Sequence, residues 1–163
     1  MRAIAFFAAL LANSASVAAE RQSLGVFFQW GAFRDTAPAR CFAIAEPRRS
    51  AKAEGWRPFA SVSFWPGQGV RGQVHIRLSR NKRPGSAVLL RIDDRTFQLF
   101  AGGANAWAAD RRGDAEIVAA MRSGIDMIIE TRSERGALVR DYYQLRGAAT
   151  AIDAAAVACS RRR

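Results

Sequence analysis

Apolar and polar residues alternate through most of the middle of the chain, which is the period of a β-strand with one face toward a core. The expected strands are residues 26–31, 41–45, 60–64, 74–78, 87–92, 95–100, 126–132 and 137–145. Asp93 and Asp94 lie between two of these strands, and residues 133–136 lie between two others, as hairpin turns do. Many short strands separated by turns predict a mainly β fold, a β-sandwich.

Two segments break this alternation and show the period of a helix. Residues 115–123 carry apolar side chains on one face, with Asp114 placed as N-cap and Gly124 placed to end the helix. An alanine-rich run at 151–159 follows Thr150, a second candidate N-cap. The sequence therefore predicts one short helix and one C-terminal helix.

The N-terminus has the layout of a secretory signal peptide. Arg2 precedes an apolar run at 3–12, and small residues at 16–19 follow it. We expect cleavage after Ala18 or Ala19, which leaves a single domain at 20–163. The alternative is a retained anchor, but the apolar run is about half the roughly 20 residues that a transmembrane helix needs. The expected location is the periplasm, the cell surface or the medium.

Cysteine content fits an exported protein. The chain has two cysteines, Cys41 and Cys159, and an even count in an oxidising compartment predicts a disulfide. The C-terminal helix can bring Cys159 onto the sheet near Cys41. The alternative is two unrelated buried thiols. The spacing does not suit a CxxC redox motif or a zinc site.

Positive charge dominates the composition. Lys and Arg number 25 against 14 Asp and Glu, a net charge of +11. Such a field attracts anionic surfaces, and the densest basic runs outside the expected sheet are Arg48 with Arg49, and Arg161, Arg162 and Arg163. These are the candidate contacts to anionic envelope components. The alternative is a solvated surface that reflects a bias toward arginine, and the spread of charge disfavours a nucleic-acid site.

Catalytic signatures are weak. His75 is the single histidine, and strand alternation places it on the outward face beside Arg77. Asp126 and Glu130 stand too far apart along one strand to work as an unaided carboxylate pair. No GxSxG motif is present. We expect no metal, no cofactor and no enzymatic activity; the alternative is a hydrolase of an envelope polymer whose catalytic residues are not identified.

Three further features have ordinary structural explanations. Gly67, Gly69 and Gly72 match a dinucleotide fingerprint in letters only, because no helix is expected after them. The tripeptide at 112–114 reads RGD, an adhesion motif, but helix entry explains it as well. Most tryptophans fit a core, and Trp56 and Trp65, which flank expected loops, are the candidates for an exposed aromatic contact.

The second half of the chain resembles the invasion-associated locus B family of exported proteobacterial proteins. The resemblance covers about 59–159 and rests on the order of strands, capped helix and terminal segment. It is carried by residues 88–93, 97–99, 107–110, 114–121, 124, 127–129, 133, 135–136, 141–142, 145–147 and 148–159. It implies an immunoglobulin-like β-sandwich, an exported location, no known enzymatic activity and a role in host-cell invasion.

Overall fold

A computed structural model describes residues 20–52 and 55–160. The predicted signal peptide and Arg161 to Arg163 lie outside these residues. The described elements are ten strands, a short 3-10 turn and two helices. In chain order they are β1 (Arg21–Phe27), β2 (Trp30–Thr36), β3 (Ala39–Ala45), β4 (Phe59–Trp65), η1 (Pro66–Gln68), β5 (Val70–Arg77), β6 (Val88–Ile92), β7 (Arg95–Gly102), β8 (Asn105–Trp107), α1 (Arg111–Ser123), β9 (Asp126–Arg132), β10 (Leu138–Gln144) and α2 (Ala148–Ser160).

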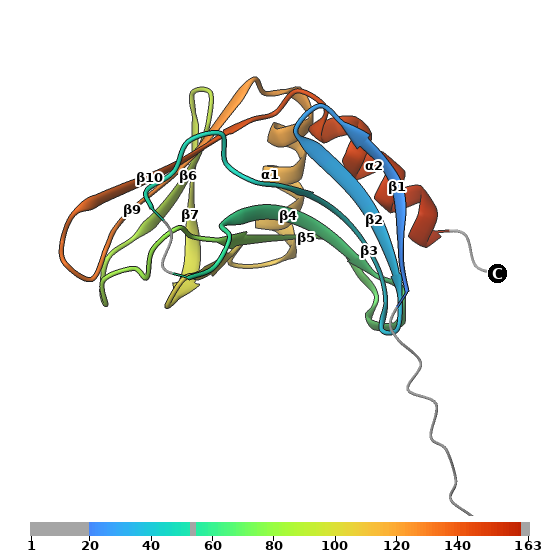
Figure 1. Cartoon of the computed structure of the whole chain (residues 1–163), viewed down its shortest axis with the longest axis horizontal. Coiled ribbons are helices and arrows are strands. Elements are labelled where there is room, and N and C mark those ends of the chain that lie inside the picture. Colours follow the sequence, from blue (N-terminus) through green and yellow to red (C-terminus); the bar gives the residue numbers. More distant parts are fainter. Residues whose placement is uncertain (1–19, 53–54, 161–163) are drawn as a thin grey trace, which may run out of the picture.

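All ten strands join one antiparallel hydrogen-bonded order, β1-β2-β3-β4-β5-β8-β7-β6-β9-β10. The sheet is strongly curved, and β6, β9 and β10 lie apart from β1 to β3 (Figure 1). The predicted mainly β class and both helices are confirmed. The immunoglobulin-like sandwich is not confirmed, because a continuous ladder connects the strands that two separate sheets would divide.

The largest error in the predicted strands is at 26–31. A hairpin turn divides this stretch, with Phe28 in the left-handed region at φ 57° between β1 and β2. The apolar residues continue through the turn, so alternation alone did not show it. The chain returns to this hairpin after β10: a Cβ on Gly147 would lie 2.0 Å from the Phe27 carbonyl oxygen. Strand β8, only three residues long, was not predicted.

Helix α1 begins earlier than predicted. Asp110 is its N-cap, accepting a 2.7 Å hydrogen bond from the Gly113 amide, and Asp114 lies in the first turn. The Asp114 carboxylate instead accepts the Val74 amide of β5 at 2.8 Å, which fastens the helix to the sheet. Gly124 ends α1 as predicted, and its amide donates to the Ala120 carbonyl. Thr150 lies inside α2 rather than at its cap.

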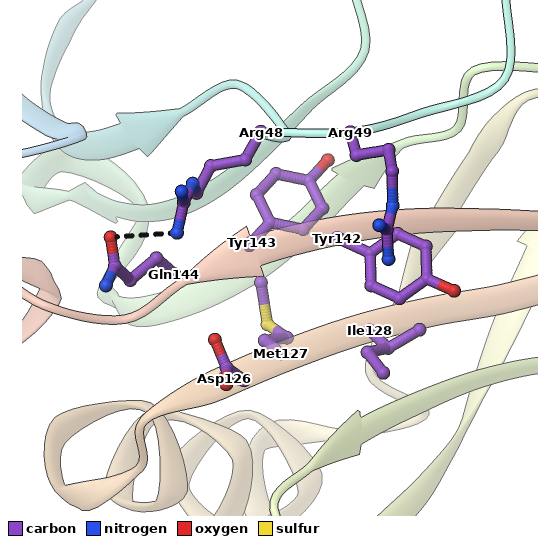
Figure 2. A pocket seen from close by; sticks show the side chains of 8 residues that line it. All are labelled: Arg48, Arg49, Asp126, Met127, Ile128, Tyr142, Tyr143 and Gln144. Atoms are coloured by element: carbon purple, nitrogen blue, oxygen red, sulfur yellow. Dashed lines mark hydrogen bonds between the residues drawn. The ribbon is translucent and has the colours of Figure 1, made fainter.

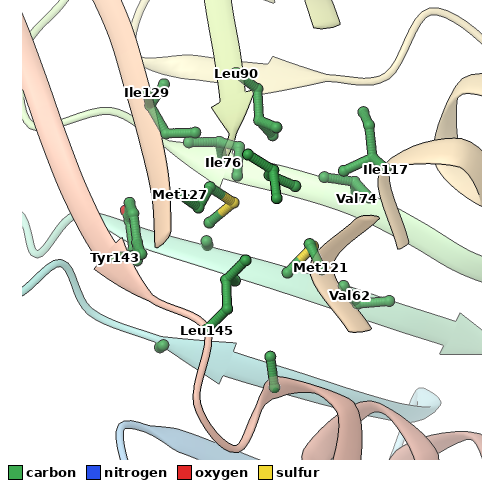
Figure 3. Packing of buried hydrophobic residues seen from close by; sticks show 14 of the residues in the cluster. Val62, Val74, Ile76, Leu90, Ile117, Met121, Met127, Ile129, Tyr143 and Leu145 are labelled. Carbon is green, nitrogen blue, oxygen red and sulfur yellow. The ribbon is translucent and has the colours of Figure 1, made fainter. Parts of the chain in front are cut away.

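The core lies between the β2–β5 region, both helices and the β6–β9–β10 region. Figure 3 shows Val62, Val74 and Ile76 against Met121 of α1 and Ile129 of β9. Small residues on β2 and β3 let α2 approach closely, since Ala32 and Ala43 are fully buried and α2 turns Ala151, Ile152 and Ala155 toward the interior.

The predicted Cys41–Cys159 disulfide is present, with the two Cα atoms 5.8 Å apart. It joins the inward face of β3 to the last turn of α2. Cys41 is fully buried, so this bond holds the C-terminal helix at the point where the alanine-lined surface allows close approach.

Candidate anion-binding pocket

The segment after β3 closes the free edge of β10 and forms a pocket there. The Arg48 amide donates to the Tyr142 carbonyl at 2.8 Å, and the Tyr142 amide donates to the Arg49 carbonyl at 2.8 Å. The pocket has a volume of about 560 Å³. Its walls are Arg48, Arg49, Asp126, Met127, Ile128, Tyr142, Tyr143 and Gln144 (Figure 2).

Strand register decides which side chains reach this pocket. Tyr142 stands opposite Ile128, and Gln144 stands opposite Asp126, so alternate residues of β9 and β10 point the same way. The residues between them, such as Tyr143, turn into the core and are buried. The open side therefore combines an aromatic ring, an aliphatic group, an amide and a carboxylate.

Both arginines are exposed, and their side chains are oriented by neutral partners. The Arg49 guanidinium lies 4.0 Å from the centre of the Tyr142 ring, a cation–π contact. An Arg48 guanidinium nitrogen, Nη1, donates to Gln144 Oε1 at 3.4 Å. Against these two cations the pocket walls carry one carboxylate, Asp126. The arrangement presents guanidinium N–H groups to solvent with a net positive charge.

Tyr143 contributes no charge to this region. Burial raises the pKa of its hydroxyl well above the ordinary value, with a smaller contribution from Asp141. The ring therefore stays neutral at physiological pH. The Trp30 indole nitrogen donates to the Gln144 carbonyl at 2.9 Å, which ties the end of β10 to β2.

The two candidate aromatic contacts are half-buried and lie in different places. Trp56 packs against the core, and its indole nitrogen donates to the Leu78 carbonyl at 2.8 Å. Trp65 lies beneath Arg40, whose guanidinium is 5.0 Å from the ring centre. Neither residue lines the pocket at Arg48 and Arg49.

His75 points outward on β5, on the same side as Arg77, as alternation predicted. Its Nε2 is 3.0 Å from Asn105 Oδ1, and its ring stacks on Trp107 with 5.0 Å between centres. Burial lowers the pKa of the imidazole, and the charges of Arg77 and Arg40 lower it further. Within the described residues, no cluster of three His, Cys, Asp or Glu side chains is placed to hold a metal ion.

The acidic candidates are separate in the structure. Asp93 forms the predicted turn between β6 and β7 with φ 50°, and its carboxylate also accepts the amides of Ile125 and Asp126. Glu130 pairs with Arg140 at 2.7 Å, while Asp126 lines the pocket. The structure thus brings no pair of these carboxylates into one site.

The RGD tripeptide lies at the entry to α1, although Asp110 rather than Asp114 caps the helix, and the glycine motif has the structural explanation expected for it. Arg112 is exposed, but the Asp114 carboxylate is engaged by the β5 backbone, so the tripeptide is not presented as a free loop. Gly69 ends the 3-10 turn between β4 and β5, with no α-helix following it.

The sequence singled out Arg48 and Arg49 as a basic run, and both line this pocket, but its other walls were not predicted. Tyr142 and Gln144 come from a strand almost a hundred residues later, and nothing in the local sequence pairs that strand with residues 48–49. The alternation that predicted 137–145 as a strand showed which of its side chains point the same way. The sequence did not show that residues 48–49 pair with the free edge of this strand.

Comparison with known proteins supports the fold. No family model and no curated protein matches the chain. Among solved structures, the fold is similar to invasion associated protein B from Bartonella henselae, with a TM-score of 0.58 and 14% sequence identity. The match covers 86% of this chain and 99% of that one. No helix of the described residues has the length and apolar character needed to cross a membrane. The resemblance found in the sequence is therefore confirmed at the level of the fold: the chain folds like an invasion-associated protein B.

Proposed function

We propose that this is an exported, non-enzymatic binding protein that contacts anionic groups of a cell envelope through Arg48 and Arg49. The observation that carries the proposal is the pocket in Figure 2, where two exposed arginines are oriented by a tyrosine ring and an amide. A guanidinium held in this way keeps N–H groups free for a phosphate or carboxylate.

Export is supported by two independent features. The N-terminal pattern of Arg2, an apolar run at 3–12 and small residues at 16–19 suits a signal peptide. The Cys41–Cys159 bond suits an oxidising compartment such as the periplasm or the extracellular medium. On this basis the mature chain begins at Ala19 or Glu20, and an intact mass from the envelope fraction tests that start.

The surroundings of His75 support a binding role over hydrolysis. Its ring contacts are the Asn105 amide and the rings of Trp107 and Phe59. Ser61 lies opposite His75 on β4, but its hydroxyl donates to the His75 main-chain carbonyl at 3.3 Å. A general base is normally oriented by a carboxylate or paired with a nucleophile, and the contacts of the imidazole ring include neither. The solved neighbour is named for invasion, so a role in contact with host cells is the related function we propose for this chain.

Co-sedimentation with anionic and neutral lipid vesicles tests the anionic contact. We expect the mature protein to bind only the anionic vesicles and to lose binding between 0.1 and 1 M salt, because the Debye length falls from about 10 Å to about 3 Å. The double variant Arg48→Glu/Arg49→Glu is expected to lose most of this binding. Arg111→Glu/Arg135→Glu makes the same change of charge at two exposed positions outside the pocket and is the matched control.

Two outcomes contradict the proposal. One is equal binding to neutral and anionic vesicles. The other is an equal loss in the pocket and control variants, which assigns binding to net charge alone. Deleting residues 161–163 separately shows how much the second predicted basic run contributes.

A further inference from the structure

The face of the sheet opposite the helices is built from rings, amides and arginines. Both helices pack on the Cys41 side of β2–β5, so alternate residues of these strands face away from them. Strand register aligns Ile44, Ser61, His75, Trp107 and Phe100 in one row across β3, β4, β5, β8 and β7. We call this the outer face. At about 4.8 Å per strand the row spans roughly 19 Å.

Arg77 is the best-oriented cation on the outer face. Its guanidinium lies 4.8 Å from the centre of the Trp56 ring, and its Nη1 donates to Asn105 Oδ1 at 3.1 Å. The Trp56 ring is itself fixed by its hydrogen bond to Leu78. The guanidinium thus lies between a tryptophan ring and a neutral amide, and the hydrogen bond to Asn105 is made by one of its N–H groups.

His75 points at the same amide oxygen as Arg77. Its Nε2 lies 3.0 Å from Asn105 Oδ1, so two nitrogen donors converge on one uncharged acceptor. Trp107 stacks on the imidazole at an interplanar angle of 6°, and Phe59 meets it edge-on at 5.2 Å. Donors that converge beside an arginine, with an amide in place of a carboxylate, leave positive charge uncompensated.

The electrostatics of the wider face agree with this. Arg77 on β5 and Arg40 on β3 are the charged groups that act on His75, and both lower the pKa of the imidazole. Arg40 shares the Asp35 carboxylate with Arg21, so the acid of that cluster is already occupied. The outer face around His75 is therefore electropositive and selects anions.

We propose that the outer face binds a linear, carboxylate-bearing polysaccharide, with Arg77 and His75 holding one carboxylate and the exposed Phe100 ring contacting the apolar part of a sugar ring. The row crosses five strands, which suits an extended chain. Amide and imidazole groups supply hydrogen bonds for hydroxyls. Charge complementarity identifies the ligand as acidic, and the mixture of ring edges and polar groups identifies it as a sugar polymer.

Two other polyanions fit the outer face less well. Single-stranded nucleic acid binds by stacking successive bases on open aromatic faces. On the outer face Arg77 covers Trp56, Arg40 covers Phe42 and Trp65, and His75 stacks on Trp107, so Phe100 is the exposed ring of the row and offers a place for a single base. Extended peptides bind to sheets by adding a strand at an edge, whereas this is the face of inner strands. Both remain as outcomes of the test.

Because His75 is the single histidine of the chain, its ring protons report on the outer face by NMR without ambiguity. Titration with trigalacturonic acid is expected to shift these signals and to raise the pKa of His75, since a bound carboxylate favours the imidazolium. By reciprocity, binding tightens as the pH falls through that pKa. Maltotriose, a neutral sugar of the same length, is expected to leave the pKa unchanged.

Variants separate this site from the pocket at Arg48 and Arg49. Arg77→Gln is expected to raise the Kd for trigalacturonic acid about tenfold, and Arg77→Lys to restore part of the binding because the charge returns without the fork. Arg48→Glu/Arg49→Glu is expected to bind the sugar normally while failing to bind anionic vesicles. If the protein does not bind vesicles, the inference about the outer face is unaffected. If it does not bind the acidic sugar, the proposal for the pocket at Arg48 and Arg49 is unaffected.

The inference is overturned by any of three results. The His75 signals and pKa do not respond to trigalacturonic acid at millimolar concentration. Maltotriose shifts the His75 signals of the parent protein as much as trigalacturonic acid does, or trigalacturonic acid shifts them equally in the Arg77→Gln variant. A thymidine oligonucleotide or an oligoglutamate peptide shifts the same signals with a lower Kd than the acidic sugar, which assigns the face to another class of ligand.

Discussion

The two faces of the central strands differ in the size and charge of their side chains and in what packs against them. On β3 to β5 the inner residues, such as Ala43, Val62 and Ile76, are aliphatic and fully buried beneath helices and the second part of the sheet. The outer residues of the same strands include His75 and Arg77, which are half-buried and held by ring and amide contacts. Along one strand, residues that pack in the core thus alternate with residues that face the proposed ligand.

This difference follows from the period of two in a strand and from what each face meets. Small inner side chains allow α2 to approach closely enough for a disulfide, and a change of volume there leaves a cavity or a clash. Outer side chains touch one another and solvent, so a change there removes contacts without disturbing the core. Stability should therefore depend on the inner face, and binding on the outer face.

Removing the disulfide is the strongest expected disruption of the inner face. Cys41→Ala/Cys159→Ala should lower the free energy of unfolding by about 2–5 kcal/mol, because the bond closes a long loop that is otherwise free in the unfolded chain. Urea unfolding monitored by circular dichroism measures the loss. The parent protein unfolded in reductant is the control and should match the variant. Unfolding midpoints that coincide for oxidised parent and variant would contradict the expectation.

Neighbouring residues on β5 give a direct contrast between the faces. Ile76→Ala should cost about 2–5 kcal/mol through lost burial and a cavity. His75→Ala, one position earlier, should cost about 0.5–1.5 kcal/mol, the range for an aromatic pair. Both variants are compared by urea unfolding at one pH. A His75 variant as unstable as the Ile76 variant would show that the outer face is part of the core.

A buried carboxyl on β10 gives a pH-dependent version of the same contrast. Asp141 is fully buried, with Oδ2 accepting the Ser79 amide at 2.9 Å, and burial raises its pKa above the ordinary value. Its contribution to stability is present below the unfolded pKa and is lost as pH rises through the folded pKa. Asp141→Asn should remove that pH-dependent loss. Between pH 4 and pH 8 the free energy of unfolding of the parent should therefore fall relative to that of the variant.

Urea unfolding of both proteins across that pH range measures the difference. Asp94→Asn, which removes an exposed carboxyl in the turn between β6 and β7, is the control and should run parallel to the parent apart from a small offset. Parallel curves for Asp141→Asn as well would show that Asp141 titrates alike in the folded and unfolded states.

The smallest effect on stability is expected at Arg77. Arg77→Gln should change the free energy of unfolding by no more than about 0.5 kcal/mol, as most surface substitutions do, while weakening binding to the acidic sugar. Thermal unfolding and the His75 titration are measured on the same sample. A variant that loses stability and binding together would mean that Arg77 braces the sheet through Trp56.

Local patterns predicted much of the sheet because alternation and turn chemistry are local. Strand β9 coincides with the predicted 126–132, and Gly124 ends α1 as expected. The errors arose where local signals compete. Phe28 lies in an apolar stretch and is not a typical turn residue, so the turn there was not predicted. Asp110 and Asp114 are both suitable N-cap residues, but only Asp110 has the extended backbone of an N-cap.

The candidate sites were less predictable because they join distant segments. Alternation placed His75 and Arg77 on one face, and charge drew attention to Arg48 and Arg49. The partners that orient them, Trp56 with Asn105 and Tyr142 with Gln144, come from loops and strands whose pairing depends on the whole fold. A single sequence contains each residue but not the register that brings them together.

Residues 48–49 pair with β10 through their main chain, while their side chains line the pocket. The two hydrogen bonds that join residues 48–49 to the edge of β10 at Tyr142 are between main-chain atoms, so almost any side chain at positions 48 and 49 preserves them. An exposed edge strand invites aggregation with other sheets, and here the protection is independent of the groups that recognise a ligand. The side chains at positions 48 and 49 can therefore be exchanged, and the ligand of the pocket changed, without exposing this part of the edge of the sheet.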